Sequence, residues 1–331
     1  MEIKAIDVQK LRKLTGAGMM DCKKALIEAN GDYAKAQEII REKGKLVAAK
    51  RADRETSEGT VVAKINGSNA ILLCLGCETD FVAKNEEFQA LAQAIADAAI
   101  QNLPADIEAL KACTIADRRT VEAAITEQIG KTGEKHMLVS YQKIEAPFIS
   151  SYVHTLNGKL GAIVGFNKEV PADLAKGIAM QVTSMNPVAV NKDSVPQNVI
   201  ENELKVAVEK TKEELVKKAV DAALTKAGIN PAHVDSEDHI QSNTAKGWLT
   251  PEQADQAREI IKTVSEEKAA NLPEAMVNNI ANGRLNKFFK ENTLEEQEYQ
   301  MGDGKESVKA YIKSIDADAK VTGFYRFSLN D

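Results

Sequence analysis

The stretch of residues 60–77, TVVAKINGSNAILLCLGC, gives the clearest structural signal in the chain. Its two halves, 60–65 and 70–75, are rich in aliphatic and β-branched residues, a composition typical of strands. Asn66 and Gly67 between them form a dipeptide that favours a tight hairpin turn. The stretch therefore predicts an antiparallel β-hairpin.

Helices are expected on the C-terminal side of this hairpin. Residues 86–101 carry apolar side chains at helical spacing, namely Phe88, Leu91, Ile95 and Ala98. An apolar face of this kind packs against a sheet. A further helix is predicted over residues 115–129, so the hairpin and the two helices would form a first α+β subdomain.

The same order recurs later in the chain. Strands are predicted at 150–156 and 160–166 around Asn157 and Gly158, and a helix is predicted at 171–185. The recurrence indicates two related α+β subdomains, each with a small antiparallel sheet.

The residues before the hairpin predict a compact module of three helices. A tight turn at 15–18 separates a first helix from a second at 20–29, and a third at 33–43 is expected to end at Gly44. Residues 1–54 carry 13 Lys and Arg against 8 Asp and Glu. This local positive charge suits docking on an acidic protein face, or simply a solvated helical surface.

After about residue 199 the pattern becomes almost wholly helical. Apolar residues at helical spacing lie between many Lys and Glu, and Thr250, Pro251 and Gln253 give a typical helix start. We expect an antiparallel helical hairpin or coiled coil inserted into the second subdomain, because a strand predicted at 321–329 must find its partner in the core. The predicted domains are residues 1–54 (three helices), 55–139 (first α+β subdomain), 140–198 with 283–331 (second α+β subdomain) and 199–282 (helical insertion).

The composition argues against several classes of protein. The 331 residues carry 43 basic and 49 acidic side chains, a net charge of −6, whereas binding to duplex nucleic acid needs a clustered basic surface. No apolar run approaches the roughly 20 residues that span a bilayer, and the first residues do not resemble a secretory leader. We expect a cytoplasmic protein with reduced thiols, and neither direct nucleic acid nor membrane as a partner.

Catalytic and cofactor motifs are missing from the sequence. There is no G-x-x-x-x-G-K-[ST] phosphate loop, and the four histidines are scattered without metal-ligand spacing. Cys74 and Cys77 form a C-x-x-C pattern that would suit a thiol oxidoreductase. They lie at a strand end, however, where odd spacing points their side chains to opposite faces, so buried structural cysteines are the alternative. We expect no catalytic residue, no cofactor and no metal site.

Two stretches are better explained as contact surfaces. Met19 and Met20 follow a tight turn. Adjacent helical positions cannot both face one core, so at least one methionine is expected at the surface unless both fill the small core. Phe81 lies in the charged loop of residues 78–85. Its ring could fold onto its own core or project as an anchor for a partner.

The same two stretches resemble a known family. TGAGMMDCKKAL at 15–26 and TDFVAKN at 79–85 are similar to the two signature motifs of the elongation factor Ts family, and they occur in the same order. SYVH at 151–154, IAMQV at 178–182 and VTGFYRF at 321–327 extend the likeness. The resemblance covers the whole chain except the helical insertion, where only the architecture is similar.

This resemblance implies a non-enzymatic exchange factor that makes the GTPase elongation factor Tu release GDP and rebind GTP. The factor would bind both the GDP-bound and the nucleotide-free GTPase. Its α+β fold would combine a ubiquitin-associated-like helical domain, two α+β subdomains and a helical projection. The core or the projection could also support a homodimer or an assembly of two factors with two GTPases.

The exchange motif implied by the resemblance is Thr79, Asp80, Phe81 and Val82. Phe81 would wedge between two helices of the GTPase near its magnesium site and disturb the coordination of metal and phosphate.

Further contacts follow from the resemblance alone. Arg12, Met19 and Met20 match positions that touch the nucleotide domain of the GTPase, and His154 matches a contact with another domain. A structural adaptor that binds ubiquitin-like partners and dimerises through its helices is a further alternative, although it leaves TDFVAKN without a purpose.

Three residues depart from the family pattern. Cys74 and Gly76 stand where an acidic and a small polar or aliphatic residue are usual, and Gln181 replaces a common histidine.

Overall fold

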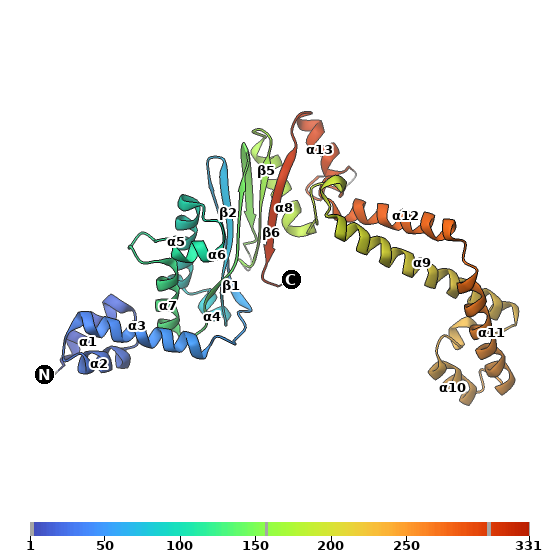
Figure 1. Cartoon of the computed structure of the whole chain (residues 1–331), viewed down its shortest axis with the longest axis horizontal. Helices are drawn as coiled ribbons and strands as arrows, with labels where there is room; N and C mark the ends of the chain where they lie inside the picture. Colours follow the sequence, from blue (N-terminus) through green and yellow to red (C-terminus); the bar gives the residue numbers. More distant parts are fainter. Residues whose placement is uncertain (1–2, 156–157, 303–305, 331) are drawn as a thin grey trace. The chain divides into compact units, whose positions relative to one another are not determined.

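The computed structural model describes residues 3–155, 158–302 and 306–330. It divides into two compact units (Figure 1), one formed by Met1–Val190 with Gln297–Asp331 and the other by Asn191–Glu296. The expected α+β class is confirmed, because helices accompany two three-stranded antiparallel sheets.

The first sheet is built on the predicted hairpin. Strand β1 (Glu58–Asn66) pairs antiparallel with β2 (Asn69–Cys77), and the register closes with Asn66 opposite Asn69. The other edge of β2 pairs with β3 (Met137–Glu145), a strand that the sequence analysis did not predict. The expected boundary between residues 139 and 140 therefore falls inside β3.

Helices cover one face of this sheet. Helix α5 (Glu86–Asn102) packs on β1 and β2 through fully buried Phe88 and Ile95, followed by α6 (Ile107–Ala112) and α7 (Val121–Thr132). The predicted start of a helix at residue 115 is wrong. The helix begins six residues later because Thr120 caps it, its Oγ1 accepting a hydrogen bond from the Ala123 amide at 3.1 Å.

The second sheet repeats the topology of the first. Strand β5 (Leu160–Phe166) lies between β4 (Phe148–Val153) and β6 (Val321–Ser328), and α8 (Ala172–Met185) covers β4 and β5. The expectation that the closing strand finds its partner in this sheet is confirmed. Helix α13 (Val308–Ile315) precedes β6. Asn157 of the expected turn lies outside the described residues.

The N-terminal helices form a small core of their own. They are α1 (Ala5–Thr15), α2 (Met19–Glu28) and α3 (Tyr33–Lys50). The predicted end of the third helix at Gly44 is wrong, because α3 continues to Lys50. Gly44 instead allows α3 to cross α7, since a Cβ there would lie 3.0 Å from the Thr126 carbonyl oxygen and 3.7 Å from the Gly130 Cα.

The second unit is helical. Its elements are η1 (Lys192–Ser194), α9 (Gln197–Lys226), η2 (Pro231–His233), α10 (Glu237–Ala245), α11 (Pro251–Ala270) and α12 (Glu274–Asn292). The long α9 packs against both α11 and α12. The predicted helix start at Thr250 is confirmed by a capping box with Gln253.

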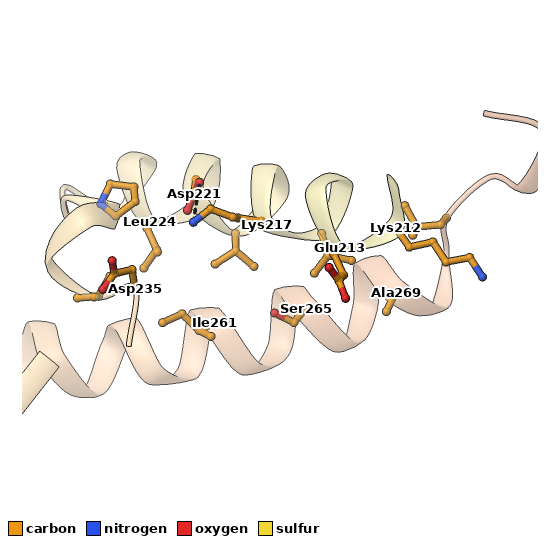
Figure 2. A pocket seen from close by; sticks show the side chains of 14 residues that line it. Lys212, Glu213, Lys217, Asp221, Leu224, Asp235, Ile261, Ser265 and Ala269 are labelled. Atoms are coloured by element: carbon orange, nitrogen blue, oxygen red, sulfur yellow. Dashed lines mark ion pairs between the residues drawn. The ribbon is translucent and has the colours of Figure 1, made fainter. Parts of the chain in front are cut away.

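A cavity of about 510 Å³ opens between α9 and α11. In Figure 2, Leu224 and Ile261 lie on the facing helices, and Lys217 pairs with Asp221 at 4.0 Å. No helix among the described residues has the length and apolar character needed to cross a membrane.

Candidate functional site

The segment between β2 and α5 forms one helical turn, α4 (Asp80–Ala83), where the sequence analysis expected a loop. Thr79 is its N-cap, and its Oγ1 accepts a hydrogen bond from the Val82 amide at 3.4 Å. Ala83 is buried, and its carbonyl accepts a hydrogen bond from Gln89 Nε2 at 2.5 Å. Val82 packs against the core of the first sheet. The turn is therefore held to the scaffold from beneath.

Phe81 points the other way. It is 83% exposed, which makes it the most exposed large hydrophobic residue that the structure describes. Successive residues of a helix are about 100° apart, so a turn that buries Ala83 and partly buries Val82 presents Phe81 to solvent. Of the two alternatives left open by the sequence, the ring projects.

Asp80 and Lys84 flank the ring with opposite charges. Their side chains form an ion pair of 2.7 Å four residues apart. The hydrogen bond from Lys84 lowers the pKa of Asp80, so this carboxylate is ionised at neutral pH. The turn therefore presents an apolar ring beside a fixed negative charge.

Two glutamates hold the base of the turn. Glu134, which follows α7, accepts hydrogen bonds from the Thr79 amide at 3.1 Å and the Thr79 hydroxyl at 2.7 Å. Glu78 accepts one from the Lys135 amide at 2.7 Å and pairs with Arg51 at 2.8 Å. The sequence analysis missed Glu134, and no local signal could have revealed it, because it lies 55 residues from its partner.

The two cysteines of the C-x-x-C pattern lie on opposite faces of the first sheet, as their spacing predicts. Cys74 belongs to the core that includes residues of the second sheet, and Cys77 belongs to the core under the helices. Burial raises the pKa of each thiol to about 12. Neither thiol forms the low-pKa thiolate that a thiol oxidoreductase needs, so this alternative is not supported.

A second exposed apolar surface lies on the N-terminal helices. Met19 and Met20 are both more than half exposed, and Arg12 is also exposed. Both methionines point outward because Cys22 and Leu26 take the positions of α2 that face the core. The sequence predicted at least one exposed methionine, and the structure has two.

His154 lies just beyond β4 and is half-buried. Its Nδ1 is 3.2 Å from the Tyr152 hydroxyl. Gln181 on α8 is fully buried. Its Oε1 accepts a hydrogen bond from the Gln300 amide at 3.0 Å, and its Nε2 donates to Gln297 at 3.2 Å. Gln181, which departs from the family pattern, therefore connects α8 to residues 297–300, where the chain re-enters the larger unit.

The predicted residues thus lie at three places on the larger unit. Residues 79–82 share one turn, Arg12 and the methionines lie on α1 and α2, and His154 follows β4. Within residues 3–155, 158–302 and 306–330, no cluster of three or more His, Cys, Asp or Glu side chains could hold a metal ion. The geometry suits contact with a protein through several surfaces.

Comparison with known proteins gives a consistent result. The family described as Elongation factor TS matches residues 78–331. Elongation factor Ts of Phocaeicola vulgatus is 54% identical over 329 residues, which cover 99% of each chain. The protein of the same name from Bacteroides fragilis is 53% identical over 329 residues, again 99% of each chain. That of Porphyromonas gingivalis is 39% identical over 330 residues, covering 100% of this chain and 99% of its own.

Proposed function

The chain belongs to the elongation factor Ts family, and from this premise we propose that Phe81 is the group by which it drives GDP from elongation factor Tu. A factor of this family is a nucleotide exchange factor and not an enzyme: it changes no covalent bond. It acts in the cytoplasm, on the GDP-bound GTPase, and leaves the nucleotide-free GTPase ready to bind GTP.

One observation carries the proposal. Phe81 is 83% exposed on a turn in which Ala83 is buried and Thr79 and Ala83 are hydrogen-bonded to the scaffold. Exposing a large apolar ring to water does not stabilise the free protein. Burying that ring in an apolar crevice of a partner would stabilise the complex. We infer that the ring enters between two helices of the GTPase near its magnesium site, with Asp80 placing a negative charge beside the metal and phosphate ligands.

Binding and exchange are coupled through the GTPase. If factor and GDP each weaken the other's hold, the effect is reciprocal. A thousandfold faster release corresponds to about 4 kcal/mol, whereas burying one phenylalanine contributes only about 2 kcal/mol. The wedge therefore needs other contacts that hold the GTPase in its altered arrangement.

We assign those contacts to the other two surfaces. Arg12, Met19 and Met20 would bind the nucleotide domain of the GTPase, with residues 1–54 acting as a ubiquitin-associated-like domain. His154, in the second α+β subdomain, would contact another domain of the GTPase. The antiparallel helical insertion, residues 199–282, would serve dimerisation or an additional partner contact.

The proposal is tested by separating binding from exchange. We expect Phe81→Ala to slow the release of a fluorescent GDP analogue at saturating factor by about tenfold or more, with a much smaller loss of affinity for the nucleotide-free GTPase. Ile65→Ala, which truncates an exposed apolar side chain on β1 of the first sheet, is the matched control and should leave both quantities unchanged. Equal losses of affinity and release rate in Phe81→Ala would contradict the wedge.

A further inference from the structure

We propose that Glu134 is a positioning residue for exchange, whose carboxylate fixes Thr79 and thereby the direction in which the next turn presents Phe81. This inference rests on the proposed role of Phe81. Glu134 does not itself need to touch the GTPase, because its effect passes through Thr79.

The contact between the two segments is reciprocal. Both Glu134 carboxylate oxygens accept hydrogen bonds from Thr79, one from the amide at 3.1 Å and one from the hydroxyl at 2.7 Å. In the opposite direction, Glu78 accepts a hydrogen bond from the Lys135 amide at 2.7 Å. Residues 78 and 79 are thus hydrogen-bonded to residues 134 and 135 in both directions. Charged acceptors make such hydrogen bonds stronger than neutral ones.

Glu134 is itself held by a rigid frame. Helix α7 ends at Thr132, its C-cap Gly133 has a left-handed φ of 73°, and the chain then leads to β3. The Glu134 amide donates a hydrogen bond to Thr132 Oγ1 at 3.2 Å, and that oxygen lies 2.7 Å from Nε2 of buried His136. The carboxylate therefore sits on a fixed base.

Lys135, the residue after Glu134, binds the segment that follows α3. Lys135 Nζ donates hydrogen bonds to the carbonyl oxygens of Ala52 and Arg54 at 2.6 and 2.8 Å. These residues follow α3, whose C-cap residue Arg51 pairs with Glu78. The chain leaving the N-terminal helices and the start of α4 are consequently attached to one pair of residues, Glu134 and Lys135.

The far end of the turn is held by Val82 and Ala83, which pack on the core of the first sheet, whereas its N-terminal end is held through Thr79. Helix α4 has only four residues, and the cap from Thr79 Oγ1 to the Val82 amide is long at 3.4 Å. Without Glu134 the Thr79 amide and hydroxyl lose their carboxylate acceptor, while the Thr79 carbonyl keeps its hydrogen bonds from the Ala83 amide at 3.1 Å and from Cys77 Sγ at 3.2 Å. The start of the turn is then held less firmly, and Phe81 samples a wider range of directions. Preorganised groups act more effectively than mobile ones because their ordering precedes binding. Losing the carboxylate should therefore impair the action of the ring more than the docking of the whole factor.

The test compares exchange, binding and local order in the full-length protein. For Glu134→Ala we expect the maximal rate of GDP release to fall about fivefold, while the factor concentration giving half-maximal release changes less than about twofold. Glu134→Gln keeps one acceptor oxygen and should lose less. Glu127→Ala is the matched control and should leave the maximal rate unchanged. Glu127 is also half-buried, but it pairs with Lys131 on α7 and with Arg119 just before that helix.

Amide hydrogen exchange supplies a readout that a general loss of stability would not reproduce. In Glu134→Ala the amides of residues 79–84 should exchange faster, while those of α5 and β2 keep their protection. In a Phe81→Ala background, adding Glu134→Ala should cause no further loss of the maximal rate, because there is no ring left to direct.

The outcomes separate the two proposals. A normal exchange rate in Glu134→Ala, together with a slow rate in Phe81→Ala, would overturn the positioning role and leave the wedge intact. A normal rate in Phe81→Ala would overturn the wedge itself. Loss of protection throughout α5 and β2, in both Glu134→Ala and Glu134→Gln, would show that Glu134 supports the fold at large and does not position the ring.

Discussion

The two sheets of the larger unit have the same topology but different connections from central strand to helix. In the first sheet, β2 leads through α4 to α5, and Phe81 on α4 is exposed. In the second, β5 leads to α8 through residues 167–171 without a helical turn, and Val170 in this connection is buried. Phe81 of the first connection faces solvent, whereas Val170 of the second is buried.

The second connection is fastened to its own sheet. Asn167 Nδ2 donates a hydrogen bond to the Asp318 carbonyl at 2.9 Å, and Asn167 Oδ1 accepts one from the Lys320 amide at 2.7 Å. Asp318 and Lys320 lie just before β6, so these hydrogen bonds attach the second connection to the start of that strand. The first connection is also fastened at its base, but it presents a ring outward. The repeated scaffold is closed by both connections, and the one that departs from the repeat carries the residue that we propose acts in exchange.

The largest expected effect is a difference in the free energy of unfolding between a core variant on α5 and a variant of the exposed turn. Phe88, on α5, is fully buried, and Phe88→Ala should lower the free energy of unfolding by about 3–5 kcal/mol. Phe81→Ala should change it by less than about 0.5 kcal/mol, since its ring is already in water. Urea unfolding followed by far-ultraviolet circular dichroism measures both. Trp248 fluorescence is unsuitable, because that residue belongs to the helical unit.

The counterpart on the second sheet provides the control for this prediction. Ile178, on α8, is also fully buried, and Ile178→Ala should cost about 2–5 kcal/mol. A strong destabilisation by Phe81→Ala would mean that its ring packs on its own chain, and the contrast between the two connections would fail.

Where the sequence predicted the structure correctly, a short-range pattern was sufficient. The hairpin around Asn66 and the helix start at Thr250 depend on residues within a few positions of each other. Gly44 was misread because a glycine usually ends a helix, whereas here it lets two helices approach closely at Gly130. That requirement arises from a segment more than eighty residues away.

The candidate site was predictable in composition but not in direction. The motif at 79–82 could be located from the sequence, yet a four-residue turn is too short for a period to indicate which side is buried. The orientation of Phe81 depends on buried Ala83 and on the distant Glu134. Contacts of this range appear only once the chain is folded.

A second, smaller effect is a pH dependence of the free energy of unfolding, which we expect to arise beneath the first connection and not the second. Burial lowers the pKa of His136, beneath the first connection, from 6.5 to about 4, partly offset by the Gln128 backbone and by the nearby Glu78 carboxylate. Between these values the unfolded chain binds a proton that the folded chain does not, so stability falls as the pH drops from 6.5 to 4. The loss amounts to about 3 kcal/mol, and below pH 4 this group contributes no further change.

Replacing the imidazole tests this assignment. His136→Gln should have a smaller loss of stability between pH 6.5 and 4 than the natural protein, as measured by amide hydrogen exchange of β2. His154→Gln, near the second sheet, is the control and should retain the full pH dependence. Identical pH profiles for His136→Gln and the natural protein would show that this histidine is not the group responsible.

The smallest expected effect concerns the ion pair beside the ring, which joins two residues of the turn itself, whereas Lys168 of the second connection pairs with Asp316 ahead of β6 at 2.7 Å. Lys84→Ala should leave the melting temperature unchanged within about 1 °C, because the pair is exposed to solvent. Without Lys84 the pKa of Asp80 rises back towards its ordinary value of 3.8, so Asp80 stays ionised at pH 7 and loses only its fixed direction. We therefore expect GDP release to slow less than about threefold in Lys84→Ala, and more in Asp80→Asn, which removes the charge itself. If Lys84→Ala slowed release as much as Phe81→Ala, the lysine would have to contact the GTPase directly, and the first connection would act through its charges as much as through its ring.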